Sequence, residues 1–224
     1  SGQAFIGDTD LAALNDRKLT QLRRDRVGFV FQAFNLVPTL TAAVTIGTMT
    51  VNSGSTVTLN GYSLTASSIT VGGSFVFLGT ETVSSVPNLL AGSSVTYNSV
   101  GTSIILSTWT YQNLVVNGTG GTFSVTSGST ITVTQGLTLS AGTFTANTSS
   151  ITITGDMNLS SGTFNANGST ISVSGNWTYN SGATFNRGSS TLILNGVSKS
   201  FGGTKDPSYY WNITVSGTIS QTME

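Results

Sequence analysis

Apolar residues alternate with small polar residues from Leu137 to Gly196, and this alternation repeats three times at a step of about 20 residues. Aligning the three copies places these residues in register: Phe144, Phe164 and Phe185; Ile151, Ile171 and Leu192; Ile153, Val173 and Leu194; Gly155, Gly175 and Gly196. The third copy is one residue longer, with Ala183 or Thr184 as the extra residue. A short fixed period is typical of a solenoid, in which each repeat buries its apolar side only against a neighbouring repeat.

Each repeat divides into three short alternating runs, separated by Gly, Ser, Asn and Asp. Alternation with period two sends one set of side chains inward, so Ile151 and Ile153 should be buried while Thr152 and Thr154 face outward. The pattern predicts an all-β fold, a parallel β-helix (β-solenoid) whose coils of about 20 residues stack about 4.8 Å apart. The three aligned phenylalanines would then form an internal stack. The alternative is a set of β-sandwich repeats, but the constant period favours the solenoid because sandwich strands and loops vary in length.

The alternation extends over residues 44–224. Two runs of the form Y-x-N-[LI]-x-V begin at Tyr111 and Tyr210, a step of about 99 residues. They predict two modules, at about 44–118 and 119–218, the second ending into a new coil. Glycine- and threonine-rich coils that alternate with such strands resemble the repeat modules of large secreted bacterial and archaeal surface proteins. Either the chain is a piece of a longer fibre or another molecule covers the open last coil. Head-to-tail stacking on copies of itself would propagate into a filament.

The composition narrows the possible partners. Charged residues make up only 7% of the 224 residues, the formal net charge is zero, and there is no His or Cys. Sparse, balanced charge provides no basic surface for nucleic acid or for an anionic membrane. The lack of Cys excludes disulfides and thiolate metal sites, and no apolar run reaches the roughly 18 residues that can span a bilayer. We therefore expect no nucleic-acid partner and no membrane insertion.

Residues 1–43 differ from the solenoid, because nine of the 16 charged residues fall within the first 26 positions. Leucines recur at roughly helical spacing at Leu11, Leu14, Leu19 and Leu22. They are followed by a basic cluster that suits a helix C-terminus, Arg23, Arg24 and Arg26. We predict a short helical segment from about Asp10 to Arg26, with Asp8, Thr9 or Asp10 as its capping residue.

The run GFVFQAFNLVPTLT stands near the end of residues 1–42. With the residues before it, this run closely resembles the part of ABC transporter ATPases, of the lipoprotein-release and macrolide-export type, that follows the P-loop and ends in the Q-loop. The resemblance implies that Gln32 matches the Q-loop glutamine, which lies near the metal and the attacking water. No G-x-x-x-x-G-K-[ST], LSGGQ-like signature or His accompanies it. We therefore expect neither ATP binding nor hydrolysis, since Gln32 lacks its partners.

A fragment of about 42 residues is too small to hold its family fold alone. Its presence is explained by a gene fusion, by a cloning or assembly artefact, or by a mismatch between sequence and protein. If the fragment folds, its leucine face would cap the first coil, because an uncovered coil exposes unpaired strand edges. The alternative is that the fragment is poorly ordered.

The solenoid contains no obvious constellation of catalytic residues. Its acids are Glu81, Asp156, Asp206 and Glu224, which are scattered along the sequence, whereas β-helical glycosidases and lyases need clustered acids or bases on one face. Asp156 directly follows Gly155, so a turn explains it better than catalysis does. There is no Asp-rich calcium motif and no His or Cys for a transition metal. We expect no catalytic residues, no cofactor and no metal.

Three surface features are candidates for carrying or binding sugar. Six Asn-x-Ser/Thr sequons, about as many as chance gives, mark candidate glycosylation sites: Asn117, Asn147, Asn158, Asn167, Asn176 and Asn212. Two outward ladders of hydroxyl side chains suggest a glycan- or ice-binding face: Thr132, Thr152 and Ser172; Thr134, Thr154 and Ser174. In the next coil these ladders continue with Ile193 and Asn195, which breaks their regularity. A third feature is a set of aromatic residues that would form either a sugar platform or, as we prefer, core and cap positions: Trp109, Trp177, Tyr179, Tyr209, Tyr210 and Trp211.

Together these patterns predict a non-enzymatic extracellular or cell-surface structural protein, part of a surface fibre, an adhesin or a self-assembling filament. Its expected partners are copies of itself, with surface glycans as a further candidate. The alternative function is a glycan- or ice-binding β-solenoid. A third interpretation is an ABC-ATPase-related protein without catalytic competence.

Overall fold

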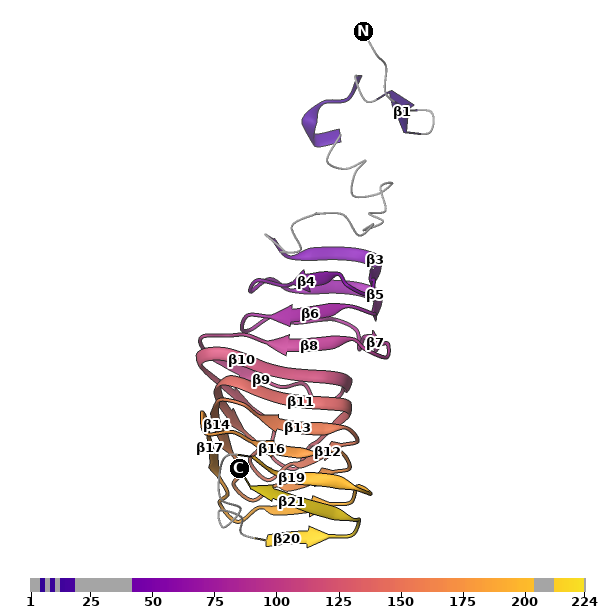
Figure 1. Ribbon diagram of the computed structural model, residues 1–224. Helices are drawn as coiled ribbons and strands as arrows, with labels where there is room; N and C mark the ends of the chain where they lie inside the picture. Colours follow the sequence, from indigo (N-terminus) through magenta and orange to yellow (C-terminus); the bar gives the residue numbers. More distant parts are fainter. Residues whose placement is uncertain (1–4, 7–8, 11–12, 19–41, 204–211, 224) are drawn as a thin grey trace. The chain divides into compact units, whose positions relative to one another are not determined.

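The computed structural model describes residues 5–6, 9–10, 13–18, 42–203 and 212–223. Contacts divide the chain into two units, Ser1–Phe34 and Asn35–Glu224. Each unit is considered by itself below, and strand labels follow Figure 1.

The first unit contains a small hairpin and a helical turn. Strands β1 (Phe5–Ile6) and β2 (Thr9–Asp10) pair antiparallel. Residues 16–18 are helical, and the Lys18 backbone N–H donates to Asn15 Oδ1 at 3.0 Å. Asn15 is therefore the capping residue. The predicted cap at Thr9 or Asp10 is wrong, because both residues belong to β2. Asp8, the predicted helix beyond Lys18, and Gln32 lie outside the described residues.

The second unit is a parallel β-solenoid of about eight turns with coils of about 20 residues (Figure 1), which confirms the predicted fold class. Its strands, in chain order, are β3 (Val44–Val51), β4 (Thr56–Thr58), β5 (Leu64–Val71), β6 (Ser74–Phe77), β7 (Asn88–Leu89), β8 (Ser94–Tyr97), β9 (Thr102–Ile104), β10 (Thr110–Ser124), β11 (Thr130–Thr145), β12 (Ser150–Ile153), β13 (Asp156–Leu159), β14 (Gly162–Asn165), β15 (Thr170–Val173), β16 (Trp177–Tyr179), β17 (Ala183–Asn186), β18 (Thr191–Leu194), β19 (Lys199–Gly203), β20 (Asn212–Val215) and β21 (Ile219–Met223).

The strands stack in three columns. The first column contains β12, β15, β18 and β20, the second contains β13, β16, β19 and β21, and the third contains β14 and β17. The long strands β10 and β11 each supply a segment to all three columns. Toward the N-terminus, β4, β6 and β8 extend the second column and β9 extends the third. β3, β5 and β7 form a separate parallel sheet.

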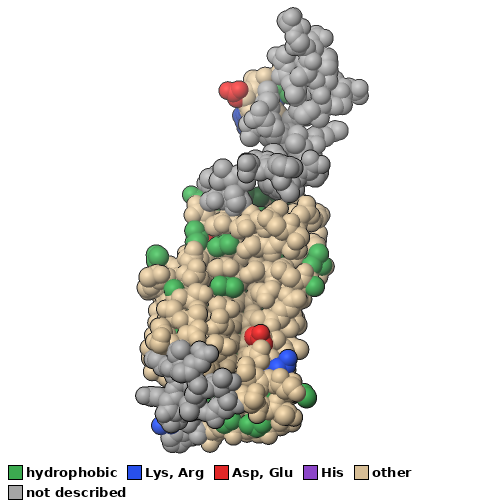
Figure 2. All heavy atoms as spheres, viewed as in Figure 1, with side chains coloured by type: hydrophobic (Ala, Val, Ile, Leu, Met, Phe, Trp, Pro, Cys, Tyr) green, Lys and Arg blue, Asp and Glu red, His purple; other side chains and the backbone are tan. Residues whose placement is uncertain are grey.

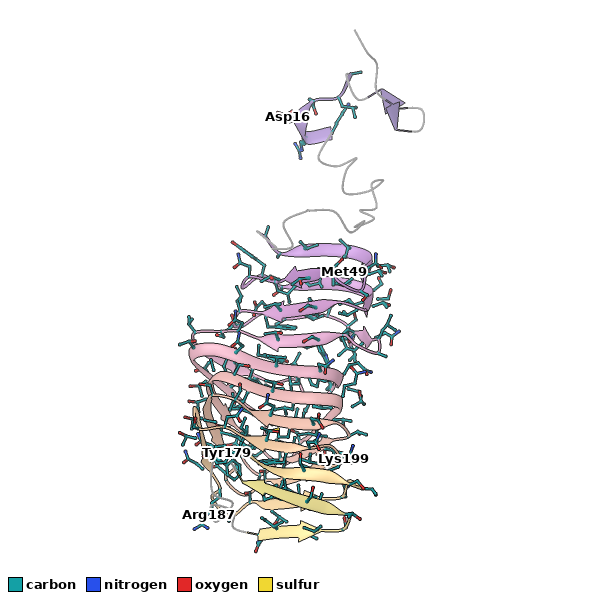
Figure 3. All side chains as sticks on the ribbon, in the orientation of Figure 1. Asp16, Met49, Tyr179, Arg187 and Lys199 are labelled. Atoms are coloured by element: carbon teal, nitrogen blue, oxygen red, sulfur yellow. The ribbon has the colours of Figure 1, made fainter. Side chains whose placement is uncertain are left out.

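The interior contains stacks of buried apolar side chains; Figure 3 draws the described side chains as sticks on the ribbon. The Phe144 and Phe164 ring centroids lie 5.0 Å apart, and those of Phe164 and Phe185 lie 5.6 Å apart. The other aligned rows predicted from the sequence also pair in register: Ile151, Ile171 and Leu192; Ile153, Val173 and Leu194. Full burial of one such side chain contributes about 1.5–3 kcal/mol. These stacks therefore supply the main stabilisation of the solenoid.

The position of the extra residue in the third copy differs from the sequence alignment, which placed it at Ala183 or Thr184. The extra residue of the third copy precedes Ala183, because Leu159 pairs with Tyr179 at a spacing of 20 residues while Gly162 pairs with Ala183 at a spacing of 21. The corner between these strands absorbs the insertion, whereas the paired strands cannot do so without losing register.

The two Y-x-N-[LI]-x-V runs occupy different columns. Asn113, in the first run, pairs with Ser94 and Gly136 in the second column. Asn212, in the second run, pairs with Thr191 in the first column. The similar sequences are therefore not structural equivalents, because the spacing between columns changes along the chain. β10 runs through the predicted module boundary at 118/119, and the division into modules stays a prediction.

A glycine stack forms the corner before the third column. Gly142 and Gly162 have φ values of +79° and +76°, a left-handed conformation that costs other residues free energy. A Cβ atom on Gly162 would also lie 2.5 Å from the Gly142 carbonyl oxygen. Close stacking of these two coils therefore requires glycine at position 162, whereas the next coil, which is one residue longer, has Ala183 at the paired position.

We predict that Gly162→Ala lowers the thermal midpoint of the solenoid more than Gly128→Ala does. Gly128 has the same φ of +76°, but a Cβ atom added to it would meet no other atom within 4 Å. Its substitution therefore costs only the left-handed backbone term of about 1–2 kcal/mol, while Gly162→Ala adds the overlap with Gly142. Thermal unfolding followed by circular dichroism measures the difference, and equal losses in the two variants would contradict the close-stacking argument.

Candidate functional site

The described residues contain few groups that could carry chemistry. No cluster of three or more His, Cys, Asp or Glu residues that could hold a metal ion occurs among them. Within the same residues, no helix is long and apolar enough to cross a membrane. Figure 2 shows one face on which uncharged polar side chains and backbone predominate, with only scattered charged groups. The candidate sites are therefore two acidic side chains, a buried tyrosine pair, the outward polar rows and the last coil.

Glu81 joins two neighbouring turns through its carboxylate. Oε1 accepts the backbone N–H groups of Gly61 at 2.8 Å and Leu78 at 2.6 Å, and Oε2 accepts that of Gly79 at 2.6 Å. The side chain is only 9% exposed. A carboxylate that receives three N–H donors is a strong structural clamp.

We predict that Glu81→Ala lowers the stability of the first coils markedly. It leaves three N–H groups without their acceptor, and each unsatisfied buried group costs about 1–3 kcal/mol. Glu81→Gln should lose less, because its amide oxygen can still accept the two N–H groups that Oε1 accepts. Thermal unfolding checks the order. Asp156→Asn is the control, since its amide oxygen keeps an acceptor for Asn176. A midpoint for Glu81→Ala no lower than that of the control would disprove the clamp.

Asp156 belongs to a ladder of turn side chains that join successive coils. The Asn176 backbone N–H donates to Asp156 Oδ1 at 2.7 Å. One coil further, Ser200 donates from its backbone N and its Oγ to Asn176 Oδ1, at 3.0 and 3.1 Å. In each step a side chain takes up the N–H of the next coil. Asp156 is the first residue of β13 and follows the bend at residues 154–155, so its carboxylate joins two coils at the start of a strand.

A buried tyrosine pair closes a hydrogen-bond circuit in the irregular part of the solenoid. The Tyr97 and Tyr111 hydroxyls lie 3.0 Å apart. Tyr97 accepts the Leu106 backbone N–H at 3.1 Å, and Tyr111 donates to the Leu106 carbonyl at 2.8 Å. With Tyr111 donating to Leu106, Tyr97 donates to Tyr111, and every donor has an acceptor. Trp109, 3% exposed, packs beside Tyr111 with ring centroids 6.1 Å apart.

The core interpretation of the aromatic residues is therefore correct for Trp109, and also for Trp177 and Tyr179, which are 1% and 4% exposed. These three side chains cannot form a sugar platform. Tyr209, Tyr210 and Trp211 lie outside the described residues.

We predict a loss of stability at alkaline pH that comes from the tyrosine pair. Burial raises the pKa of Tyr97 from 10.0 to about 12, and burial also raises the pKa of Tyr111. Between pH 10 and 12 the folded protein keeps its tyrosine protons while the unfolded chain releases them. The contribution of the pair to the free energy of unfolding is therefore fully present below pH 10 and is lost as the pH rises toward 12. Thermal midpoints across this range measure it.

The double variant Tyr97→Phe/Tyr111→Phe is the control for this prediction. It should be less stable at neutral pH, because the Leu106 backbone groups lose their partners. Its stability should fall less between pH 10 and 12. An equal fall in the double variant would show that other groups cause the alkaline transition.

The six sequons differ in how available their side chains are. Asn147 Nδ2 already donates to the Val125 carbonyl at 2.7 Å, and Asn176 Oδ1 accepts from the next coil. Asn158 Oδ1 is buried and has no hydrogen-bond partner among the described residues. The remaining three are exposed, namely Asn117, Asn167 and Asn212. Glycosylation stays a prediction, with these three as the accessible acceptors.

The outward hydroxyl rows occur in two columns. Thr132, Thr152 and Ser172 stand in register and meet Ile193 in the next coil, as expected. The third column carries an unbroken row that sequence reasoning missed: Thr102, Thr122, Thr143, Thr163 and Thr184. The signal was available, because four of these threonines directly precede the stacked phenylalanines.

The last coil leaves two apolar side chains uncovered. Ile213 and Val215 on β20 pair in register with Leu192 and Leu194 on β18. Leu192 and Leu194 are 1% and 2% exposed, whereas Ile213 and Val215 are 41% and 52% exposed. These two residues thus continue the buried rows with a larger exposed fraction.

Comparison with known proteins finds a resemblance over a short segment. No protein-family model and no solved structure matches the chain. Over 41 residues it is 51% identical to an uncharacterized ABC transporter ATP-binding protein of Methanocaldococcus jannaschii, covering 18% of this chain and 17% of that protein. A Thermotoga maritima ABC transporter ATP-binding protein is 44% identical over 41 residues, 18% of each chain. A Mycobacterium bovis protein of the same description is 52% identical over 42 residues, 19% of this chain and 13% of its own.

The chain thus spans less than a fifth of the length of these curated relatives. The expected resemblance of one segment to ABC transporter ATP-binding proteins is confirmed, and the larger part of the chain is a β-solenoid.

Proposed function

We propose that this protein is a non-enzymatic structural component of an extracellular or cell-surface fibre, adhesin or filament. The observation that carries the proposal is the unbroken stacking of buried rows through the second unit, as in the phenylalanine row from Phe144 to Phe185. Every coil is fixed to the next by parallel backbone pairing and by side-chain contact. Such a body resists bending and local unfolding, which are the properties a fibre or stalk needs.

The environment of the acidic groups supports a role without catalysis. Glu81 is engaged by three backbone N–H groups, and Asp156 accepts one from the next coil. Among the described residues of the solenoid, Glu81 and Asp156 are the two acids, and they lie in different coils rather than paired as glycoside cleavage requires. The short ABC-type segment supports only the third interpretation, an ABC-ATPase-related protein without catalytic competence.

The neutral exterior supports a location outside the cell. Uncharged Thr, Ser and Asn side chains make the outward face hydrophilic. The repeat modules of secreted surface proteins, which the chain resembles, have the same composition. The unbroken threonine row from Thr102 to Thr184 supports the alternative proposal, a glycan- or ice-binding face. Binding on a glycan array or thermal hysteresis would favour that alternative.

We predict that antibodies raised against the folded solenoid label intact producing cells as strongly as permeabilised ones. Labelling that appears only after permeabilisation would contradict the surface location. We also predict that the purified protein has the same thermal midpoint with and without magnesium ATP, because we expect no nucleotide to bind. A nucleotide that did bind, present at 100 times its Kd, would stabilise the protein by about 2.7 kcal/mol and raise the midpoint. A midpoint raised by nucleotide would instead favour the ATPase-related interpretation.

A further inference from the structure

The third column presents an outward row of threonines that spans five coils. Its strands are β9, one segment each of β10 and β11, β14 and β17, and each pairs in parallel with the next. In every strand one threonine stands in register with that of the neighbouring coil: Thr102, Thr122, Thr143, Thr163 and Thr184. Parallel pairing sets neighbouring threonines about 4.8 Å apart. These five residues, here named the threonine row, therefore form a regular series of hydroxyl and methyl groups.

The hydroxyls of the threonine row are available to an outside partner. Thr102, Thr122 and Thr184 are exposed, and Thr143 and Thr163 are half-buried. Within the part of the chain that the structure describes, no hydrogen bond uses any of these five hydroxyls. A threonine hydroxyl donates one hydrogen bond and can accept two. The row therefore offers a full set of donors and acceptors at each coil.

The outward rows of the first column are less available. The Thr134 hydroxyl donates to the Tyr111 carbonyl at 3.1 Å. Ser174 Oγ donates to Asn195 Oδ1 at 2.9 Å, and Ile193 interrupts the neighbouring row. The third column is therefore the face on which the hydroxyls are both regular and unengaged.

The core beneath the threonine row fixes its spacing. Four of its threonines directly precede buried phenylalanines: Phe123, Phe144, Phe164 and Phe185. The ring centroids of Phe144 and Phe164 lie 5.0 Å apart, and those of Phe164 and Phe185 lie 5.6 Å apart. Because these rings pack on one another, the outward threonines are held at set positions before any partner arrives. Binding at such a preorganised surface costs little conformational entropy.

A second row of side chains lies beside the threonine row. Ser124, Thr145, Asn165 and Asn186 stand two residues further along the same strands, which is about 6.6 Å at the usual rise of a strand. Ile104 takes this position in β9. Asn186 Nδ2 donates to Asn165 Oδ1 at 2.7 Å, and Asn165 Nδ2 donates to Thr145 Oγ1 at 3.4 Å. The face thus repeats in two directions, along the strand and from coil to coil.

The chemistry of this face selects a neutral partner with a regular repeat. The strands β9, β10, β11, β14 and β17 contain no charged residue, so an ionic partner finds no counter-charge on them. The aromatic residues of the column are the buried phenylalanines, which offer no ring surface on which a sugar could stack. Ice is a neutral lattice of hydrogen-bonded water that repeats over a few ångströms along each of its axes. It therefore suits this face better than a glycan does.

We propose that the threonine row binds an ice surface. Its hydroxyls hydrogen-bond a file of water molecules at the coil spacing of about 4.8 Å, and this file continues as one row of the ice lattice. The threonine methyl groups pack against the lattice between these contacts, which removes apolar surface from liquid water. The inference rests on the alternative function proposed above, a glycan- or ice-binding face, and it assigns that face to ice and to the third column.

Partition into slowly growing ice tests the proposal. The full-length protein in dilute buffer is partly frozen from a cold surface, and its concentration in the ice is compared with that in the remaining liquid. An unrelated soluble protein in the same sample serves as the internal reference and stays in the liquid. We expect the parent chain to be enriched several-fold in the ice relative to this reference, and to show thermal hysteresis.

A matched pair of lysine variants locates the binding face. Thr122→Lys places a long charged side chain within the threonine row, and Thr152→Lys places the same side chain at an exposed threonine of the first column. Both positions are exposed, so both variants should keep thermal midpoints close to that of the parent. We expect Thr122→Lys to lose most of the enrichment in ice and Thr152→Lys to keep it. Thr143→Lys, in the middle of the row, is a second variant with the same expected loss.

Three outcomes would overturn the proposal. The parent chain could partition like the reference protein, or the row variants and Thr152→Lys could lose enrichment equally. The parent could also bind an insoluble neutral polysaccharide such as cellulose, lose that binding in Thr122→Lys and show no enrichment in ice, which would assign the row to a glycan. Antibody labelling of intact cells does not depend on the threonine row, so failure of ice binding and failure of the proposed surface function are distinguishable.

Discussion

The structure depends on one constraint, the parallel in-register pairing of each coil with the next. This pairing sets equivalent residues of successive coils about 4.8 Å apart, so any side chain at a repeated position meets a similar side chain above and below. Apolar groups gain from this repetition, as the Phe144 to Phe185 row does. Like charges at the same spacing would repel one another. A sequence with only 7% charged residues is therefore a consequence of the fold.

The few acids that remain in the described solenoid stand where the repeat is broken or where backbone donors receive them. Glu81 lies in the irregular N-terminal part and binds three N–H groups of two turns. Asp156 is followed one coil later by Asn176, a neutral residue of similar shape that repeats its hydrogen bond without repeating its charge. Asn suits the corners for the same reason, because its amide oxygen accepts the backbone N–H of the next coil without adding charge, as Asn176 does.

Much of the solenoid can be predicted from its sequence because period, burial and register are linked. The rows of Phe, Ile and Val follow directly from the 20-residue step, and the exposed Thr152 and Thr154 follow from the alternation. Features that depend on corners could not be predicted in the same way. The residue inserted before Ala183 and the column in which Asn212 lies are decided by corner length, which the strand pattern does not encode. The contacts of Glu81 and of the Tyr97–Tyr111 pair do not recur from coil to coil, so the repeat pattern could not predict them.

The corner that absorbs an extra residue before Ala183 has an evolutionary consequence. Because length changes are tolerated between strands while the rows stay in register, duplication of one coil within the gene would insert a complete new layer whose upper and lower surfaces already match their neighbours. The length of such a protein can then be tuned by copy number, by recombination between near-identical DNA segments, without redesigning any part of the core.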